Sequence, residues 1–217
     1  MNEQTILLAT AASLGCIHTL LGPDHYLPFI VLSKAQGWTM AKTMWITFIS
    51  GIAHVASSVL IGMIGVGLGA SLHKLESVES WRGGVVSWAL FLFGVGYTIY
   101  GIYKYVRHSH HAHLPIAEEE ARTFRATPWI VFLIFFFGPC EVLIPLLFYP
   151  ASERNMFSIF LVALVFAIAT IGTMLVMVFL GYKGFSLVKI RNRERYVHLL
   201  AGLIILVSAG GMLFLGW

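Results

Sequence analysis

The sequence is poor in charge and in cysteine. Only 11% of its 217 residues are charged, 58% are hydrophobic, and the mean hydropathy is +0.83. This composition leaves too little polar surface for a soluble globular protein. The two cysteines, Cys16 and Cys140, both lie in apolar segments, which excludes an extracellular disulfide framework. A nucleotide-binding motif such as a Walker A loop is also missing, and no nucleophile arrangement typical of an enzyme is recognisable, so we expect no enzyme.

The chain instead contains long apolar runs. Segments of sufficient length to cross about 30 Å of hydrocarbon can be placed at 5–33, 43–70, 83–105, 128–149, 156–181 and 196–217. The first run is too polar at its centre, and too poor in flanking positive charge, for a cleavable signal peptide. We therefore expect an all-α integral membrane protein with six transmembrane helices, in which residues 1–217 form a single transmembrane domain.

Lysine and arginine are distributed unevenly between the expected loops. Loops one, three and five carry eleven of these residues, and loops two and four carry three, which are Lys74, Arg82 and Arg154. By the positive-inside rule, the odd loops are cytoplasmic and both termini lie on the outer side of the membrane. We therefore expect a multi-pass protein of the inner (plasma) membrane. The pI of about 9.2 follows from this bias, so no nucleic-acid partner is expected.

Ionisable residues interrupt the first apolar run. Asp24 and His25 directly follow Gly22-Pro23, and His18 lies seven residues before His25. Burying a carboxylate and imidazoles at bilayer depth is costly, which makes them candidates for a functional site. A Gly-Pro pair breaks a helix and leaves backbone groups that only a cavity or neighbouring protein can satisfy. The alternative is a buried Asp–His pair that only fixes packing.

The same pattern returns later in the chain. The run Gly138-Pro139-Cys140-Glu141 lies 116 positions after Gly22, and weaker matches keep nearly the same offset in the following helices. This repetition predicts two three-helix repeats, 1–105 and 128–217, joined by a cytoplasmic linker at 106–127. Because three crossings reverse direction, the repeats would be inverted, with helices one and four broken at Gly-Pro and a site near the midplane.

Two further groups of histidines need interpretation. His54 is the only titratable residue in the second apolar segment; a lone histidine is often structural, but a ligand role is slightly favoured here. The linker contains four closely spaced histidines, His108, His110, His111 and His113. They suit flexible chelation of divalent ions, although a solvated linker that binds metal only incidentally is an equal alternative.

These motifs resemble a known group of membrane proteins. His18-x5-Asp24-His25, His54 with following hydroxyl residues, the histidine-rich linker and Gly-Pro-Cys-Glu look like the nickel/cobalt transporter and urease-accessory-type permeases. That group is itself similar to the thiol–disulfide conduits of cytochrome c biogenesis. One departure is that the nickel/cobalt permeases typically have His-x4-Asp-His. The resemblance implies six metal-binding residues: His18, Asp24, His25, His54, Cys140 and Glu141.

The resulting hypothesis is a secondary permease for a divalent transition metal. Imidazole, carboxylate and thiolate suit such ions, and the resemblance implies Ni²⁺ or Co²⁺, with Zn²⁺ as a further candidate. The metal would be a transported substrate, with no permanently bound cofactor, and the expected partners are that ion, the lipid bilayer and a second copy of the chain. The alternative is a conduit for reducing equivalents that uses Cys140. Cys16 lies two helical turns from the position it would need for a disulfide.

Overall fold

The computed structural model describes residues 2–69, 71–107, 117–140, 142–153, 155–187 and 193–215. All the regular secondary structure in these ranges is helical. In chain order the elements are α1 (Glu3–Leu21), η1 (Pro23–His25), α2 (Leu27–Ala35), α3 (Met40–Gly67), α4 (Leu72–Arg107), α5 (Ala117–Phe137), α6 (Leu143–Ser152), α7 (Met156–Leu187) and α8 (Arg193–Leu215).

Length and apolar composition place the molecule in a membrane. Within the described residues, five helical stretches are long and apolar enough to cross a bilayer: Glu3–Leu21, Met40–Gly65, Leu72–Val106, Met156–Phe185 and Tyr196–Phe214. Their outer faces expose large apolar side chains such as Trp45, Leu92 and Val207. Water would disfavour so much exposed apolar surface, whereas lipid tails accept it. The expectation of an all-helical, multi-pass membrane protein is confirmed.

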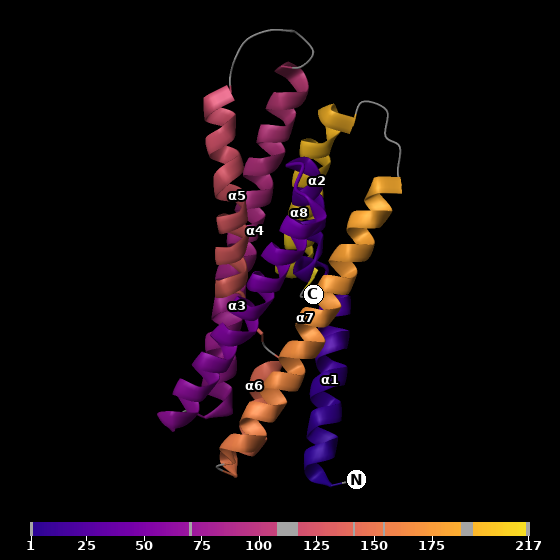
Figure 1. The fold of residues 1–217 in the computed structure, drawn as a ribbon. Coiled ribbons are helices and arrows are strands. Elements are labelled where there is room, and N and C mark those ends of the chain that lie inside the picture. The colour runs from indigo at the N-terminus through magenta and orange to yellow at the C-terminus, as the bar shows by residue number, and fades with distance from the viewer. Residues whose placement is uncertain are drawn as a thin grey trace.

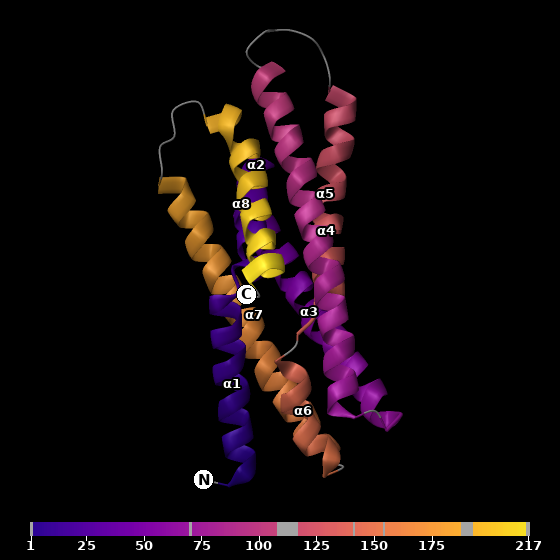
Figure 2. The same ribbon diagram turned by 180° about the vertical axis from the view of Figure 1, so that it is seen from behind.

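The helices run roughly along one axis and alternate in direction (Figure 1). The chain rises from the N-terminus through α1 and α2, returns through α3 and rises again through α4. It then descends through α5 and α6, rises through α7 and descends through α8 (Figures 1 and 2). The segment α1–α2 and the segment α5–α6 therefore run in opposite directions.

Two short interruptions divide these segments. α1 ends at Leu21 and α2 begins at Leu27, with the 3-10 turn η1 between them. α5 ends at Phe137 and α6 begins at Leu143. Each interruption contains one of the two Gly-Pro pairs, where proline removes a backbone donor. The apolar run expected at 128–149 is divided in this way, and neither α5 nor α6 is among the five stretches that could cross a bilayer on their own.

Helix α4 differs from the expected third span. It begins at Leu72, eleven residues before the predicted start, and continues to Arg107. Arg82 therefore lies within a helix and not in the loop that the sequence had predicted; the side of the membrane on which it lies stays a prediction. The reason is local, because Arg82 forms an ion pair with Glu79 one turn earlier, and a paired charge can be tolerated where an isolated one would end an apolar segment.

The core of the bundle depends on close approach of α4 and α8. A Cβ atom at Gly94 would lie 2.8 Å from the backbone nitrogen of Leu206, and one at Gly202 would lie 2.6 Å from that of Thr98. Only glycine fits at such distances, as is common where membrane helices touch. Residues on this side, including Leu90 and Ile205, form a buried cluster with Phe29 of α2, which fixes the helices that surround the interruption after α1.

Candidate metal centre

Three histidines meet where the first interruption faces α3. His18 lies in the last turn of α1, His25 in η1, and His54 within α3. The ring centroids are 4.7 Å apart between His18 and His25, and 5.2 Å apart between His25 and His54. His25 and His54 are each 4% exposed. The break after α1 thus turns the chain so that His25 fits between two helical histidines.

Local contacts orient the imidazole of His25. Its Nδ1 lies 3.2 Å from Oδ2 of Asp24 and 3.2 Å from the carbonyl oxygen of Gly22. Both partners are acceptors, so these contacts assign a proton to Nδ1. A carboxylate that holds one ring nitrogen leaves the other nitrogen available as a ligand, which is the usual arrangement of histidine in metal sites. Asp24 therefore orients His25 in this structure.

Cys140 completes the cluster from the second interruption. Each of His18, His54 and Cys140 offers one ligand atom, and these three atoms all lie within 4.8 Å of one another. Cys140 is fully buried and His54 nearly so. Bonds of about 2.0 Å to nitrogen and 2.3 Å to sulfur imply separations of roughly 3.5 Å around a tetrahedral ion. If the three ligand atoms moved about 1 Å closer to one another, all three could bind one ion.

Each of these histidines has a ring nitrogen without a hydrogen-bond partner among the described residues. Nε2 of His18, of His25 and of His54 is buried and makes no hydrogen bond to any residue that the structure describes. An unsatisfied buried polar group costs about 1–3 kcal/mol, and such groups usually have a partner such as water or an ion. Three of them at one place therefore point to a ligand.

A cavity connects this cluster with the neighbouring helices. Its volume is about 950 Å³, and its wall includes His18, Asp24, His25 and His54. Part of the wall is formed by α4, where small residues such as Ser87 line the cavity. The cavity is larger than a single metal ion, so a hydrated ion could also enter. Apolar side chains make up most of the remaining wall.

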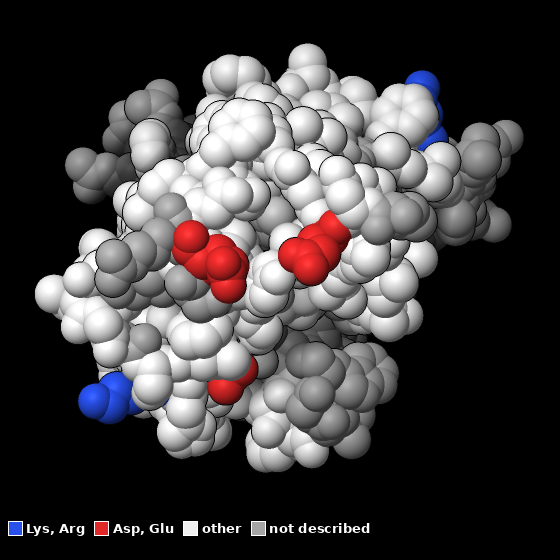
Figure 3. All heavy atoms as spheres, turned by 90° about the horizontal axis from the view of Figure 1, so that it is seen from below, with Lys and Arg blue, Asp and Glu red and all other residues white. Residues whose placement is uncertain are grey.

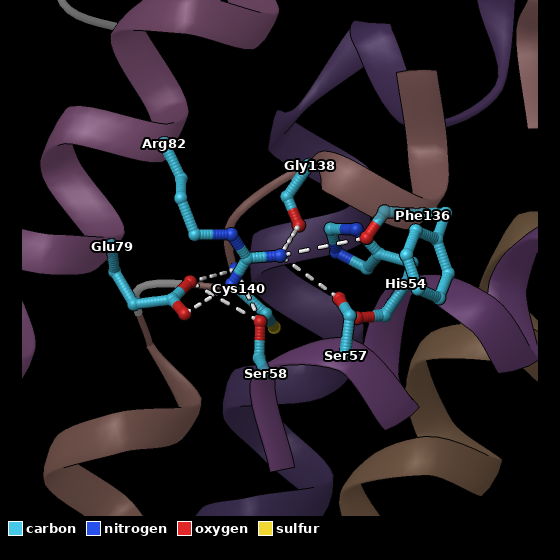
Figure 4. A network of polar contacts seen from close by, with 8 residues as sticks. All are labelled: His54, Ser57, Ser58, Glu79, Arg82, Phe136, Gly138 and Cys140. Atoms are coloured by element: carbon cyan, nitrogen blue, oxygen red, sulfur yellow. Dashed lines mark hydrogen bonds and ion pairs between the residues drawn. The ribbon is translucent and has the colours of Figure 1, made fainter. Parts of the chain in front are cut away.

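A second polar network lies beside Cys140 (Figure 4). Arg82 and Glu79 of α4 form an ion pair, and Glu79 is fully buried. Oε2 of Glu79 accepts hydrogen bonds from the backbone nitrogen of Cys140 at 3.0 Å and from the hydroxyl of Ser58 at 3.2 Å. Arg82 also donates to the hydroxyl of Ser57 at 3.0 Å. This network joins α3 and α4 to the interruption between α5 and α6.

Sequence reasoning missed Glu79 and Arg82. Their spacing of three residues is typical of an ion pair on one face of a helix, and this was the signal that could have identified them. The hydroxyl residues Ser57 and Ser58 were noted beside His54, but nothing in the sequence indicated that they contact α4.

The structure brings five of the six predicted ligands into one neighbourhood. His18, His54 and Cys140 form the compact triplet, His25 lies between the two histidines, and Asp24 contacts His25. Glu141 lies outside the described residues, as do the four histidines of the linker. Cys16 is exposed on α1, whereas Cys140 is buried.

Comparison with known proteins gives the family. The model of the family described as cytochrome C biogenesis protein transmembrane region matches residues 28–210, most of the chain. The chain belongs to this family. No curated protein and no solved structure matches it.

Membership in this family supports one part of the sequence-based resemblance and not the other. The relation to the thiol–disulfide conduits of cytochrome c biogenesis is supported. The relation to nickel/cobalt permeases, and metal transport with it, has no support from the family match. The alternative function, a membrane conduit for reducing equivalents, is therefore the one that the family favours, whereas the side-chain geometry resembles a metal site.

Proposed function

We propose that the protein binds a divalent transition-metal ion at the centre of the membrane and carries it across. The observation on which this rests is the convergence of His18, His54 and Cys140, whose ligand atoms from three separate elements lie within 4.8 Å of one another. A packing role would not require three buried Nε2 atoms without hydrogen-bond partners in the described part of the chain. A cation shared by these groups would offset the cost of burying them.

The donor set limits the ion. Imidazole and thiolate prefer Ni²⁺, Co²⁺, Zn²⁺ and copper, whereas Mg²⁺ and Ca²⁺ prefer oxygen ligands. Among these ions, Ni²⁺ and Co²⁺ are favoured by the resemblance of the His18–His25 motif to nickel/cobalt permeases. Histidine and cysteine must lose protons before they bind a metal, so exchange of protons for the metal ion is a suitable coupling reaction.

The arrangement of the helices supports an inverted repeat. If α1 with α2, and α5 with α6, are each the two halves of one broken span, the chain crosses the membrane six times. The contacts between the two repeats then occur in matching pairs. α1 packs against α7, and the corresponding contact in the other repeat is that of α5 with α3. α3 also touches its counterpart α7, and α4 touches its counterpart α8. The opposite directions of the two broken segments agree with this scheme (Figure 1). Rocking of one repeat against the other would open the site to each side in turn.

The charge at the end that carries the N-terminus supports the proposed orientation. Among the described residues, acidic side chains lie on this face, and basic side chains are seen only toward the edge of the view (Figure 3). Glu3, Glu76 and Glu153 are exposed there. Cytoplasmic ends of membrane proteins are instead rich in lysine and arginine. This supports the proposal that the N-terminus is outside and that the histidine-rich linker is cytoplasmic.

A thiol–disulfide conduit is the second candidate, and the family match favours it. In such a conduit, Cys16 and Cys140 would transfer two electrons and two protons to a disulfide of an acceptor protein, and a dithiol donor would reduce them again. The two cysteines would have to meet during this cycle. In the structure one of them is exposed on α1 and the other is fully buried beside α3.

The role of Cys16 separates the two functions. We would reconstitute the purified protein in liposomes that enclose a metal-sensitive dye, and compare the wild type with Cys16→Ser, Cys140→Ser and His54→Ala. The metal carrier predicts that Cys16→Ser retains Co²⁺ binding and flux, that Cys140→Ser weakens both, and that His54→Ala abolishes them. If both serine variants lose a dithiol-dependent activity that His54→Ala retains, the conduit replaces the metal carrier.

A further inference from the structure

The interruption between α5 and α6 leaves backbone groups that need hydrogen-bond partners. The last carbonyl groups of a helix and the first amides of the next have no partners within their own helices. Inside a membrane there is little water to replace them, and each unsatisfied group is costly. The carbonyl groups of Phe136 and Gly138 and the amide of Cys140 are such groups.

One pair of residues on α4 provides partners on both sides of this interruption (Figure 4). Nη2 of Arg82 donates to the carbonyl oxygen of Gly138 at 3.3 Å and to that of Phe136 at 3.5 Å. Glu79 accepts the amide hydrogen of Cys140 at 3.0 Å, and Ser58 shares this amide at 3.1 Å. The guanidinium group of Arg82 thus contacts carbonyl groups at and just after the end of α5, and the carboxylate of Glu79 contacts the amide of Cys140 that follows.

The backbone groups at the interruption after α1 find their hydrogen-bond partners in a different way. The amide of Gly22 donates to the carbonyl oxygen of His18 at 2.9 Å, and the carbonyl oxygen of Gly22 accepts from the amide of His25 at 3.1 Å. These contacts all lie within the interruption or the helix turn before it. The position of Cys140, in contrast, depends on side chains from another helix.

Glu79 is unsuited to bind the metal itself. One carboxylate oxygen is paired with Arg82, and the other accepts from Ser58 and from Cys140. A buried carboxylate whose charge is balanced by a neighbouring arginine is stable only while the pair remains intact. Glu79 instead holds the backbone of Cys140, the residue that would bind the ion. Hydrogen-bond partners that orient a ligand in this way are common around metal sites.

We propose that Glu79 and Arg82 are positioning residues, which hold the backbone at Cys140 so that its sulfur faces His18 and His54. This inference rests on the proposed metal site. It predicts that removing either charge leaves the histidines in place but withdraws the thiolate from the ion.

The first test measures the thiolate directly. Co²⁺ is added to purified protein, and its affinity and the thiolate-to-cobalt charge-transfer absorption are recorded for Glu79→Ala, Glu79→Gln and Arg82→Ala. Loss of a residue that orients a ligand usually weakens metal binding by about 10- to 100-fold. We expect this loss, with a weaker charge-transfer band per bound ion, in both alanine variants. Glu79→Gln keeps an acceptor for the Cys140 amide and should restore part of the band.

The second test needs no metal and therefore remains valid if the proposed function fails. In a Cys16→Ser background, maleimide labels only Cys140, which is fully buried in the wild type. Glu79→Ala and Arg82→Ala should speed labelling, and Glu79→Gln should speed it less. Glu76→Ala, an exposed carboxylate one turn away on α4, is the matched control. Ile205→Ala, in the buried cluster that also contains Phe29 and Leu90, controls for a general loss of stability.

The results give a clear decision. If Glu79→Ala and Arg82→Ala label at the rate of Glu76→Ala, or no faster than Ile205→Ala, the positioning role is wrong. If labelling is faster as expected but the wild type binds no Co²⁺, the positioning role stands and the metal carrier falls. A charge-transfer band that is unchanged in both alanine variants would also overturn the inference.

Discussion

The rings of His25 and His54 lie 5.2 Å apart at an interplanar angle of 90°. His25 belongs to the short turn after α1, and His54 lies within α3. On its other side, His25 lies 4.7 Å from the ring of His18. His25, at a helix interruption, therefore lies between two helical histidines, and Cys140 reaches the same place from the second interruption.

Replacing His25 tests whether the cluster acts as a unit. His25→Ala removes the ring between His18 and His54 and leaves Asp24 without its 3.2 Å partner. We expect Co²⁺ binding by the purified protein to be lost, as measured by isothermal titration calorimetry. His73→Ala is the matched control, because His73 is an exposed histidine on α4. Equal affinities of the two variants would contradict a role for His25 in the site.

Substitution of Gly22 tests the geometry of the first interruption. A Cβ atom there would lie 2.7 Å from Nδ1 of His25 and 3.0 Å from Oδ1 of Asp24. Gly22→Ala must therefore displace one of these side chains, and we expect metal affinity to fall without loss of membrane insertion. Gly172→Ala is the control, since a Cβ atom on that residue of α7 meets nothing within 4 Å. Metal titration of both variants measures the difference, and an unaffected Gly22→Ala protein would show that the interruption does not shape the site.

The contact of α4 with α8 can be tested through stability alone. Gly202→Ala would place a Cβ atom 2.6 Å from the backbone nitrogen of Thr98, and overpacking of this kind costs about 1–3 kcal/mol. We expect a lower midpoint of thermal unfolding in detergent. Gly210→Ala lies on the same helix and opens onto free space, so its midpoint should match or slightly exceed that of the wild type, because alanine favours a helix more than glycine does. A similar decrease in both variants would contradict the packing explanation.

The linker histidines are predicted to assist capture of the metal on the cytoplasmic side. His108, His110, His111 and His113 lie outside the described residues, and their role rests on their spacing. Replacing all four with alanine should shift the metal concentration at half-maximal flux and leave the flux itself measurable in liposomes, because a transport site needs groups held on packed helices. Complete loss of flux in a normally inserted protein would place these residues in the transport path.

The amino-acid sequence determined the class of the molecule and most of its candidate site. Apolar runs predict membrane helices because a bilayer imposes a minimum length and excludes charge. The Gly-Pro pairs predicted breaks in the first and fourth apolar runs, and the ionisable or thiol residues near them gave the candidates His18, Asp24, His25 and Cys140. The two broken spans, the inverted repeat, the six crossings and the transported ion stay predictions.

Only the tertiary structure decided which groups touch. Candidate ligands more than eighty residues apart, such as His54 and Cys140, are brought together by packing of α3 against the segment between α5 and α6. Hydropathy placed Arg82 in a loop because it treats each charge as isolated, whereas the folded protein pairs Arg82 with the buried Glu79. A charge can enter the membrane when a partner compensates it, and the identity of that partner depends on side chains meeting in three dimensions.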